Sequence, residues 1–368
     1  MIYLITFFSS YLFLVLSEIK LKNCSKYIKQ LLIVIGIAIP VMLAAARSMN
    51  VGTDVKVYGY SVFNTAVKST RFSDMNYLRG WYQIELGYRA INFIVSRFTD
   101  NLFWILGAIQ LFIDILVYQA LKYFKNHVCA EFKISWGMLI FYLLFYNETL
   151  NLMRQSMALA IVLFTFRYIY QNKPVHYFIG VVLAMQFHIT AIVTLLFYPL
   201  YYLIVIKDKK KLLYGIVTGC LVSGTVLPRI IVVVIQSGLL GEKFNRYLSL
   251  GEGTFSLTQM FIRIPFVIAL FYLSRKKRLE EPNTNYWMAV LLLDFAFAEL
   301  RSSLTPLYRI SLYFSWFKMQ AYYDIVRGSR RCNRKYIQWG MITFFLVLWW
   351  YQNVYMGNNG TYPYSFAY

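Results

Sequence analysis

Long apolar runs separated by short basic clusters are the feature that most constrains how this chain folds. Each run is about 15 to 20 residues long, which is the length that a helix needs to cross the hydrocarbon layer of a membrane. Hydrophobic residues make up 59% of the chain, and its mean hydropathy is +0.51. A soluble domain of 368 residues would need many more polar residues to cover its surface. The sequence therefore predicts an all-α, polytopic integral membrane protein.

The basic clusters account for much of the formal net charge of +21. They occur between apolar runs, in the stretches KLKNCSKYIK, LKYFKNH, KDKKK, SRKKR and RGSRRCNRK. A nucleic-acid-binding protein would instead gather its Lys and Arg on one face or helix, so we exclude nucleic acid as a partner. Cytoplasmic connections of membrane proteins are enriched in Lys and Arg. Placing all these clusters in the cytoplasm predicts a path with both termini outside.

About twelve transmembrane helices follow from this path. They are predicted at residues 3–17, 31–46, 102–121, 134–147, 152–170, 177–189, 190–206, 212–235, 258–274, 285–300, 303–323 and 337–351. The first run lacks a preceding basic residue and a small-residue cleavage site, so we expect a retained span rather than a signal peptide. The spans form one membrane domain, residues 1–368, with large outer loops at about 47–101 and 236–258. The four cysteines lie far apart, so we expect no metal site and no disulfide.

One apolar run has an unusual length. Residues 176–206 would form a helix about 46 Å long, which is too long for one crossing and short for two. A single crossing would also place the cluster KDKKK outside. We therefore predict two short or partly re-entrant helices with a break near His188, where the irregular backbone is buried in protein or lines a wet cavity.

The first outer loop is rich in aromatic and charged residues. Loops of this length usually carry function or cover a site. Its stretch IELGYRAINFIVSRF, residues 84–98, has the apolar spacing of a helix and is predicted to lie along the membrane surface.

Arg154 and Gln155 open the apolar run NLMRQSMALAIVLF, residues 151–164. One interpretation is that Arg154 extends its side chain to the membrane surface. The other is a binding site, because the first turn of a helix offers unpaired N–H groups and a partial positive charge. An arginine there is suited to grip a phosphate or diphosphate.

Three side chains in the outer segments have the chemistry of a base. His188 lies at the proposed helix break, and imidazole transfers protons readily near neutral pH. Asp54 follows a glycine in a predicted turn, and Glu85 shares a predicted helix face with Arg89 and Asn92. Each also has an ordinary structural interpretation. His188 would be a polar residue at a helix break, Asp54 a solvated turn residue, and Glu85 a member of a surface ion pair.

Two further arginines lie at the predicted outer side. Arg47 ends the second span, and Arg309, with Tyr313 one turn later, falls in the outer half of its span. A charge within a membrane costs roughly 3 kcal/mol, so such residues are candidates for function. Arg263 and Arg229 are also embedded, each near a proline, and we rank them lower.

The candidate residues come from distant segments, and the topology was set without them. It nevertheless places all of the charged candidates and His188 on the outer side. We therefore expect one outward-facing cavity with catalytic candidates Glu85, His188 and Asp54, and with substrate-binding candidates Arg47, Arg154, Gln155, Arg309 and Tyr313.

The order of these motifs resembles the EpsG/Wzy-type family of bacterial polysaccharide polymerases, over nearly the whole chain. The matching pieces are Arg47 with GTD (52–54), ELGY (85–88) with Asn92, NLMRQSMA (151–158), FH (187–188), RISLYF (309–314) and YPY (362–364).

The resemblance implies a GT-C-like membrane glycosyltransferase of the bacterial inner membrane, acting at its periplasmic face. It would join undecaprenyl-diphosphate-linked oligosaccharide donor and acceptor units into O-antigen, capsule or exopolysaccharide. Its other partners would be the membrane lipid and, as an open alternative, a chain-length regulator. No metal, nucleotide or other cofactor is expected. The alternatives are a flippase or transporter of lipid-linked oligosaccharides, a membrane O-acyltransferase that uses His188, and a structural scaffold.

Overall fold

The structure is a computed structural model, and it describes residues 1–19, 25–78, 84–209, 211, 215–216, 218–219, 233, 256–276, 281–299 and 305–367. Within these residues the chain is built from helices, as the sequence predicts, and only one isolated β-bridge occurs. The chain divides into two compact units. Unit 1 comprises Met1–Ile192 and Trp339–Tyr368, and unit 2 comprises Val193–Gln338.

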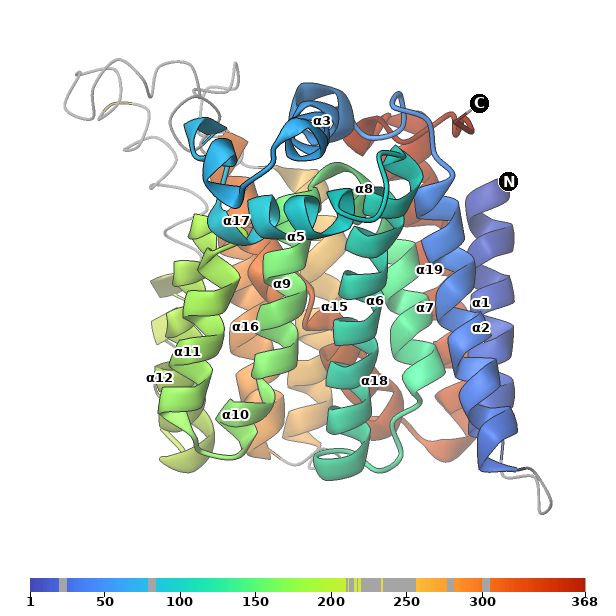
Figure 1. Ribbon diagram of the computed structural model, residues 1–368. Coiled ribbons are helices and arrows are strands. Elements are labelled where there is room, and N and C mark those ends of the chain that lie inside the picture. Colours follow the sequence, from blue (N-terminus) through green and yellow to red (C-terminus); the bar gives the residue numbers. More distant parts are fainter. Residues whose placement is uncertain are drawn as a thin grey trace. The chain divides into compact units, whose positions relative to one another are not determined.

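Unit 1 holds a set of upright helices, seen in Figure 1. They are α1 (Ile2–Glu18), α2 (Lys26–Ala45), α6 (Leu102–His127), α7 (Ile134–Leu144), α8 (Tyr146–Asn151), α9 (Met153–Thr165), α10 (Arg167–Tyr170) and α11 (Pro174–Met185), with most of α19 (Arg334–Trp349). The long loop after α2 adds short helices at one end, namely η1 (Val55–Gly59), α3 (Tyr60–Lys68), η2 (Phe72–Met75) and α5 (Leu86–Ser96). We call this end, where α2 finishes and α6 and α9 begin, the site end.

Four of the described helical segments are long and apolar enough to cross a membrane alone: Lys26–Ala45, Leu102–His127, Ile189–Ile206 and Leu257–Arg275. Three shorter helices are also apolar: Ile2–Glu18, Ile134–Leu144 and Pro174–Met185. These segments coincide with predicted spans and support a membrane-integral protein. The number of twelve crossings stays a prediction.

Small residues allow the helices of unit 1 to pack closely, as is usual between membrane helices. A Cβ on Gly36 of α2 would come within 3.0 Å of Leu14 of α1, and Ser10 donates a hydrogen bond to the Gly36 carbonyl at 2.6 Å. Gly180 plays the same part between α11 and α9, because a Cβ there would approach Thr165 to 2.5 Å.

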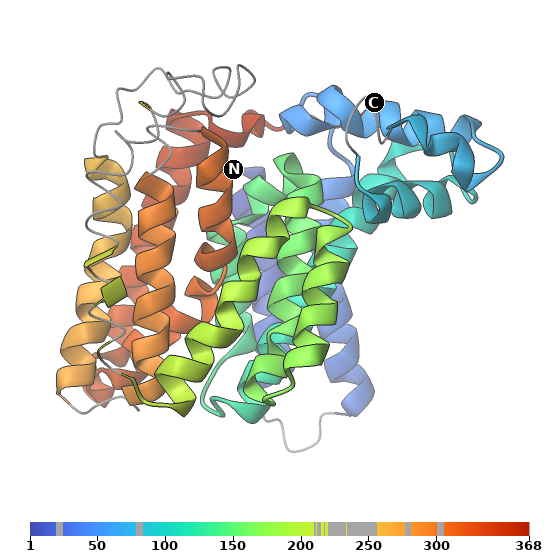
Figure 2. The ribbon, with the colours of Figure 1, turned by 90° about the vertical axis from the view of Figure 1, so that its left-hand side faces the viewer.

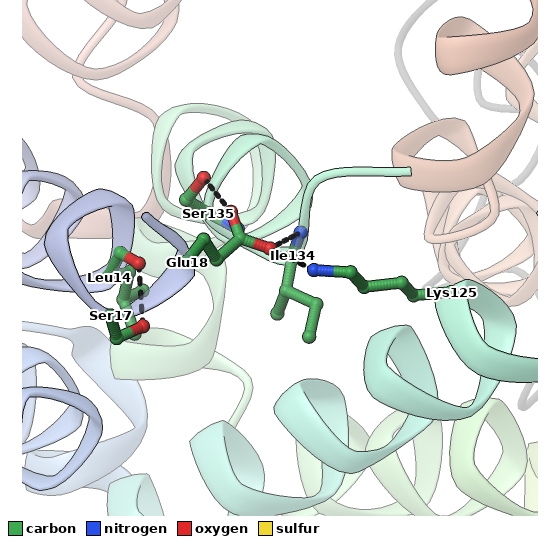
Figure 3. Close-up of polar contacts among 6 residues, drawn as sticks. All are labelled: Leu14, Ser17, Glu18, Lys125, Ile134 and Ser135. Atoms are coloured by element: carbon green, nitrogen blue, oxygen red, sulfur yellow. Dashed lines mark hydrogen bonds and ion pairs between the residues drawn. The ribbon is translucent and has the colours of Figure 1, made fainter. Parts of the chain in front are cut away.

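At the end opposite the site, one carboxylate joins three helices (Figure 3). The Glu18 side chain, at the end of α1, accepts a hydrogen bond from Lys125 of α6 at 2.8 Å. It also accepts the Ile134 backbone N–H at 2.8 Å and the Ser135 hydroxyl at 2.6 Å. Glu18 therefore caps the first turn of α7 from another helix, where N–H groups have no partner within the helix.

The predicted break near His188 is confirmed. Helix α11 ends at Met185, and after a turn the chain continues as η3 (Ile189–Leu196), α12 (Phe197–Tyr201) and η4 (Tyr202–Ile206). The turn is held against the start of α5, because the Gly87 N–H donates to the Gln186 carbonyl at 2.6 Å. A side chain at position 87 would collide with that carbonyl and with the Phe187 ring, both 2.8 Å away.

The C-terminal residues 357–367 form a strap across the site end of unit 1, and the strap begins with the short helix η9 (Asn358–Gly360). The Ser48 N–H donates to the Ser365 carbonyl and the Ala367 N–H to the Ala46 carbonyl, both at 2.9 Å. Arg47, between them, forms the isolated bridge with Phe366. The strap is thereby joined to the segment that follows α2.

Further bonds fix the strap to other elements of unit 1. Tyr3 of α1 donates to the Thr361 carbonyl at 2.6 Å, and Asn147 of α8 donates to the Thr361 hydroxyl at 2.8 Å. The Tyr364 hydroxyl donates to the Leu43 carbonyl at 2.7 Å. The YPY motif is thus part of the packing around the end of α2.

Unit 2 contains α15 (Leu257–Arg275), α16 (Glu281–Glu299), α17 (Thr305–Ser315) and α18 (Lys318–Gly328). Its buried Asp294 accepts from Arg263 at 2.8 Å and from Lys318 at 2.7 Å. Arg263 is therefore held in an ion-pair cluster between helices. Arg229, and nearly all of the predicted span 212–235 and loop 236–258, lie outside the described residues.

Candidate functional site

Arg154 is the second residue of α9, and its guanidinium lies between a carboxylate and an aromatic ring. Its Nη1 is 2.7 Å from Glu85 Oε2, and its Cζ lies 4.4 Å from the centre of the Tyr58 ring. Both charged side chains are partly exposed, at 19% for Arg154 and 17% for Glu85. A cation over an aromatic face is stabilised by the ring's quadrupole. The first turn of α9 is thus joined to the N-cap residue of α5.

The GTD turn contacts the same point from another direction. Tyr58 donates its hydroxyl to Asp54 Oδ2 at 2.6 Å. The Asn151 side-chain oxygen accepts the Thr53 hydroxyl at 2.8 Å and the Asp54 N–H at 3.2 Å. One ring, that of Tyr58, therefore orients both the Asp54 carboxylate and the Arg154 guanidinium.

Gly52 makes this contact possible. Its φ is +88°, in the region that favours glycine, and its N–H donates to the Gly360 carbonyl at 2.9 Å. A Cβ at position 52 would collide with the Leu150 carbonyl. The conformation and the close approach therefore both require glycine in the GTD motif.

Two buried tyrosines form the inner wall of the cluster. The rings of Tyr58 and Tyr88 pack edge to face with centroids 5.7 Å apart. Burial raises the pKa of both phenols well above the ordinary value of tyrosine. The hydroxyls stay protonated across the physiological range, so Tyr58 remains a hydrogen-bond donor to Asp54.

Arg47, a substrate-binding candidate, is more buried than Arg154, because its side chain is only 2% exposed. It donates to the Ala44 carbonyl at 3.1 Å and contacts the Met153 sulfur at 3.4 Å. Its Nε has no hydrogen-bond partner, and it forms no ion pair with a carboxylate in the described part of the chain. Among the described residues, Arg47 therefore brings a buried positive charge without a carboxylate partner next to the start of α9.

His188 and Gln155 are also at the site end. His188 is half-buried, and its Nδ1 lies 2.6 Å from the Thr190 hydroxyl. The contact of Gly87 with Gln186 brings the turn that carries His188 to the start of α5, next to Glu85. Gln155 follows Arg154 but is buried, at 2% exposed.

Arg309 and Tyr313 belong to unit 2. Arg309 is exposed on α17, whereas Tyr313, one turn later, is buried. Five predicted residues, namely Arg47, Asp54, Glu85, Arg154 and His188, are thus brought together within unit 1. For Arg309 and Tyr313, a place in the same site stays a prediction.

The aromatic residues of the first loop separate into two groups. Tyr58, Phe63 and Tyr88 are buried, whereas Tyr60 and Tyr77 are exposed, at 46% and 53%. Trp81 and Tyr82 lie outside the described residues, and Phe72 packs edge to face on Phe93 at 5.6 Å.

The sequence analysis did not identify Tyr58, which contacts both Asp54 and Arg154, or Asn151, which accepts hydrogen bonds from Thr53 and Asp54. The spacing of four between Asp54 and Tyr58 was the available signal, because side chains at i and i+4 meet on a helical turn. It also overlooked charged residues inside predicted spans, among them Asp114, Asp294 and Lys318, for which the apolar context was the signal. Asp114 accepts from Gln110 at 2.8 Å, in the core of unit 1.

Comparison with known proteins gives one match. The family model described as the EpsG family matches residues 30–366. No match was found among curated proteins or among solved structures. The matched range contains every residue of the cluster described above, and it covers nearly the whole chain. The chain therefore belongs to the EpsG family.

Proposed function

We propose that this protein is a polysaccharide polymerase of the bacterial inner membrane. It joins undecaprenyl-diphosphate-linked oligosaccharide units into a long surface polysaccharide at the outer face of that membrane. The observation that carries the proposal is the Arg154 cluster, in which Arg154 contacts Glu85 and Tyr58 while Tyr58 holds Asp54. Membership of the EpsG family supports a polymerase role.

The reaction is a glycosyl transfer between two lipid-linked chains. An acceptor sugar hydroxyl attacks the anomeric carbon of the donor, a new C–O bond forms, and the bond from that carbon to the diphosphate oxygen breaks. The hydroxyl proton passes to a carboxylate, and the diphosphate leaves with the bonding electron pair. A site for this step needs a base beside the hydroxyl and positive charge beside the leaving group.

Glu85 is the base that the geometry favours. Its Oε2 is held by Arg154, and its Oε1 makes no hydrogen bond with any described residue. We assign Oε1 as the atom that accepts the proton of the sugar hydroxyl. Asp54 and His188 are the alternative bases, and Asp54 is already engaged by the Tyr58 hydroxyl.

Arg154 and Arg47 supply the positive charge in different ways. Arg154 is partly exposed at a helix N-terminus, where it can contact the diphosphate directly. Arg47 is buried and acts through its field, which the apolar surroundings screen little. The exposed rings of Tyr60 and Tyr77 offer flat apolar faces for the glycan.

The test compares three variants in a strain whose surface polysaccharide depends on this gene. Arg154→Ala and Glu85→Gln are expected to collapse the ladder to a single repeat unit on its acceptor, a loss of more than about 100-fold in chain growth. Lys56→Ala, an exposed charge on the same loop, should leave the ladder normal. Immunoblotting of membranes checks that all variants are present in equal amounts.

Other results would contradict the proposal. Normal chains in Arg154→Ala would remove the residue from the mechanism. Loss of even the single repeat unit, with lipid-linked units retained inside the cell, would indicate a flippase. An unchanged ladder that lacks an acyl group would indicate an O-acyltransferase.

A further inference from the structure

Helix α5 (Leu86–Ser96) buries its polar residues Arg89 and Asn92, whereas its apolar residues Leu86 and Ile94 are exposed. This is the reverse of what a helix on a water-soluble surface shows. The reversal concerns the helix whose N-cap residue is Glu85, so the surroundings of α5 bear directly on the Arg154 cluster.

The buried face is fixed by the rest of the loop. Arg89 is 4% exposed and donates to the Asn76 side-chain oxygen at 2.9 Å and to the Met75 carbonyl at 3.3 Å. Asn92 is fully buried and donates to the Tyr88 carbonyl at 2.8 Å. The two Arg89 bonds determine how the helix is rotated, so the exposed apolar side chains cannot turn inwards without breaking them.

The exposed face carries large apolar side chains in helical register. Leu86 is 47% exposed, Ile94 is 59% exposed and Phe98, just after the helix, is 85% exposed. Ala90 lies between Leu86 and Ile94 in the same four-residue repeat. A contiguous apolar stripe of this kind marks an interaction surface.

The position of α5 indicates what covers this stripe. It lies across the upper ends of α6 and α9 in Figure 1, and in Figure 2 the cyan part of the chain that contains it projects beyond the upright helices. It packs on α6, which it precedes by only residues 97–101. Trp104, in the first turn of α6, is 60% exposed, and tryptophan is enriched where a membrane meets water. The stripe therefore lies beside the end of a membrane-length helix.

We propose that α5 is an interfacial helix whose stripe of Leu86, Ile94 and Phe98 is embedded in the outer leaflet, between the phospholipid headgroups and the acyl chains. Embedding transfers the exposed apolar side chains from water into the apolar region of the leaflet, which is favourable. It also sets Glu85 and Arg154 at the depth of a lipid-linked diphosphate, which can then reach Arg154 sideways from the leaflet. This last clause rests on the proposed function, whereas the docking of α5 does not.

The docking is tested by lipid-borne quenching of a fluorescent label. Ile94→Cys and Lys56→Cys are made separately in a chain without its four native cysteines and labelled with bimane. The protein is reconstituted into vesicles of phosphatidylethanolamine and phosphatidylglycerol with spin-labelled lipids. The label at position 94 is expected to be quenched several-fold more by the lipids than the label at position 56, and less by aqueous iodide.

Two results would overturn the docking. Equal accessibility of both labels to iodide would mean that the stripe faces water. Cross-linking of position 94 between two copies, without lipid quenching, would mean that a second copy of the chain covers it.

A second measurement separates the docking from the proposed function. Ile94→Lys should reduce chain growth several-fold on a lipid-linked donor in vesicles, whereas the control Ile94→Leu should not. Unchanged growth in Ile94→Lys would overturn the link between the docking of α5 and substrate entry. If the wild-type protein forms no polymer while the label at position 94 is quenched by lipid, the proposed polymerase function is refuted and the docking of α5 in the leaflet is retained.

Discussion

At the scale of single residues, the arginine at the start of α9 has a specific environment. Arg154 is stabilised by Glu85 on one side and by the Tyr58 ring on the other. Tyr58 is the common member, because its hydroxyl also holds Asp54. A tyrosine that positions two charged groups without contacting the substrate should affect rate more than protein stability.

Tyr58→Phe removes the hydroxyl and keeps the ring under Arg154. The lost hydrogen bond to a charged group is worth about 1.5–3 kcal/mol, so chain growth should fall roughly ten- to a hundredfold. Tyr58→Leu, which also removes the cation–π contact, should be more severe. Polymer formation is measured in vesicles at equal protein amounts. A Phe variant as active as the wild type would show that Asp54 does not need this bond.

At the scale of helices, the unpaired backbone N–H groups at a helix end can be hydrogen-bonded by a side chain from a different helix. The Glu18 carboxylate of α1 satisfies N–H groups at the start of α7 and pairs with Lys125 of α6 (Figure 3). A capping residue normally belongs to the helix that it caps or lies next to it in sequence. Here α1 and α7 are joined across more than 100 residues, so this bond fixes how they pack.

Glu18→Ala should lower the free energy of unfolding by about 1–3 kcal/mol, because the Ile134 and Ser135 N–H groups lose their acceptor. Unfolding is followed in detergent micelles by circular dichroism. Glu131→Ala removes the same charge from an exposed position in the α6–α7 connection and should change stability little. Equal effects of both changes would mean that only net charge matters.

At the scale of the whole molecule, the two ends of the chain meet around the second helix. The C-terminal strap bonds to Tyr3, Leu43 and Asn147, and pairs with the backbone on both sides of Arg47. The strap thus keeps water from an arginine that has no carboxylate partner among the described residues.

Deletion of residues 357–368 should lower the melting temperature by about 5 °C or more and abolish chain growth. Several hydrogen bonds of about 1 kcal/mol each are lost, and Arg47 becomes solvated. Phe366→Ala is the matched control, since its side chain is 51% exposed and the backbone pairing remains. Normal chain growth after the deletion would show that the reaction does not require Arg47 to be shielded from water by the strap.

The sequence by itself determined the class of the protein, the helical segments and their approximate ends, and the break near His188. These follow from local patterns, because a membrane accepts only segments whose length and apolarity match its thickness. The sequence also placed Arg154 among the candidates, since a charged group at the start of an apolar run is costly and stands out. Asp54 and Glu85 were candidates because their carboxylates lie in a long loop and have the chemistry of a base.

Only the tertiary structure decided which of these residues meet. Arg154 contacts Glu85 and Tyr58, which lie up to about 100 residues away in the sequence, and no local pattern encodes such pairs. It also showed that Arg47 is buried while Arg154 is partly exposed, and that the polar face of α5 is turned inwards. Burial depends on which elements cover a side chain, and that is fixed when distant parts of the chain pack together.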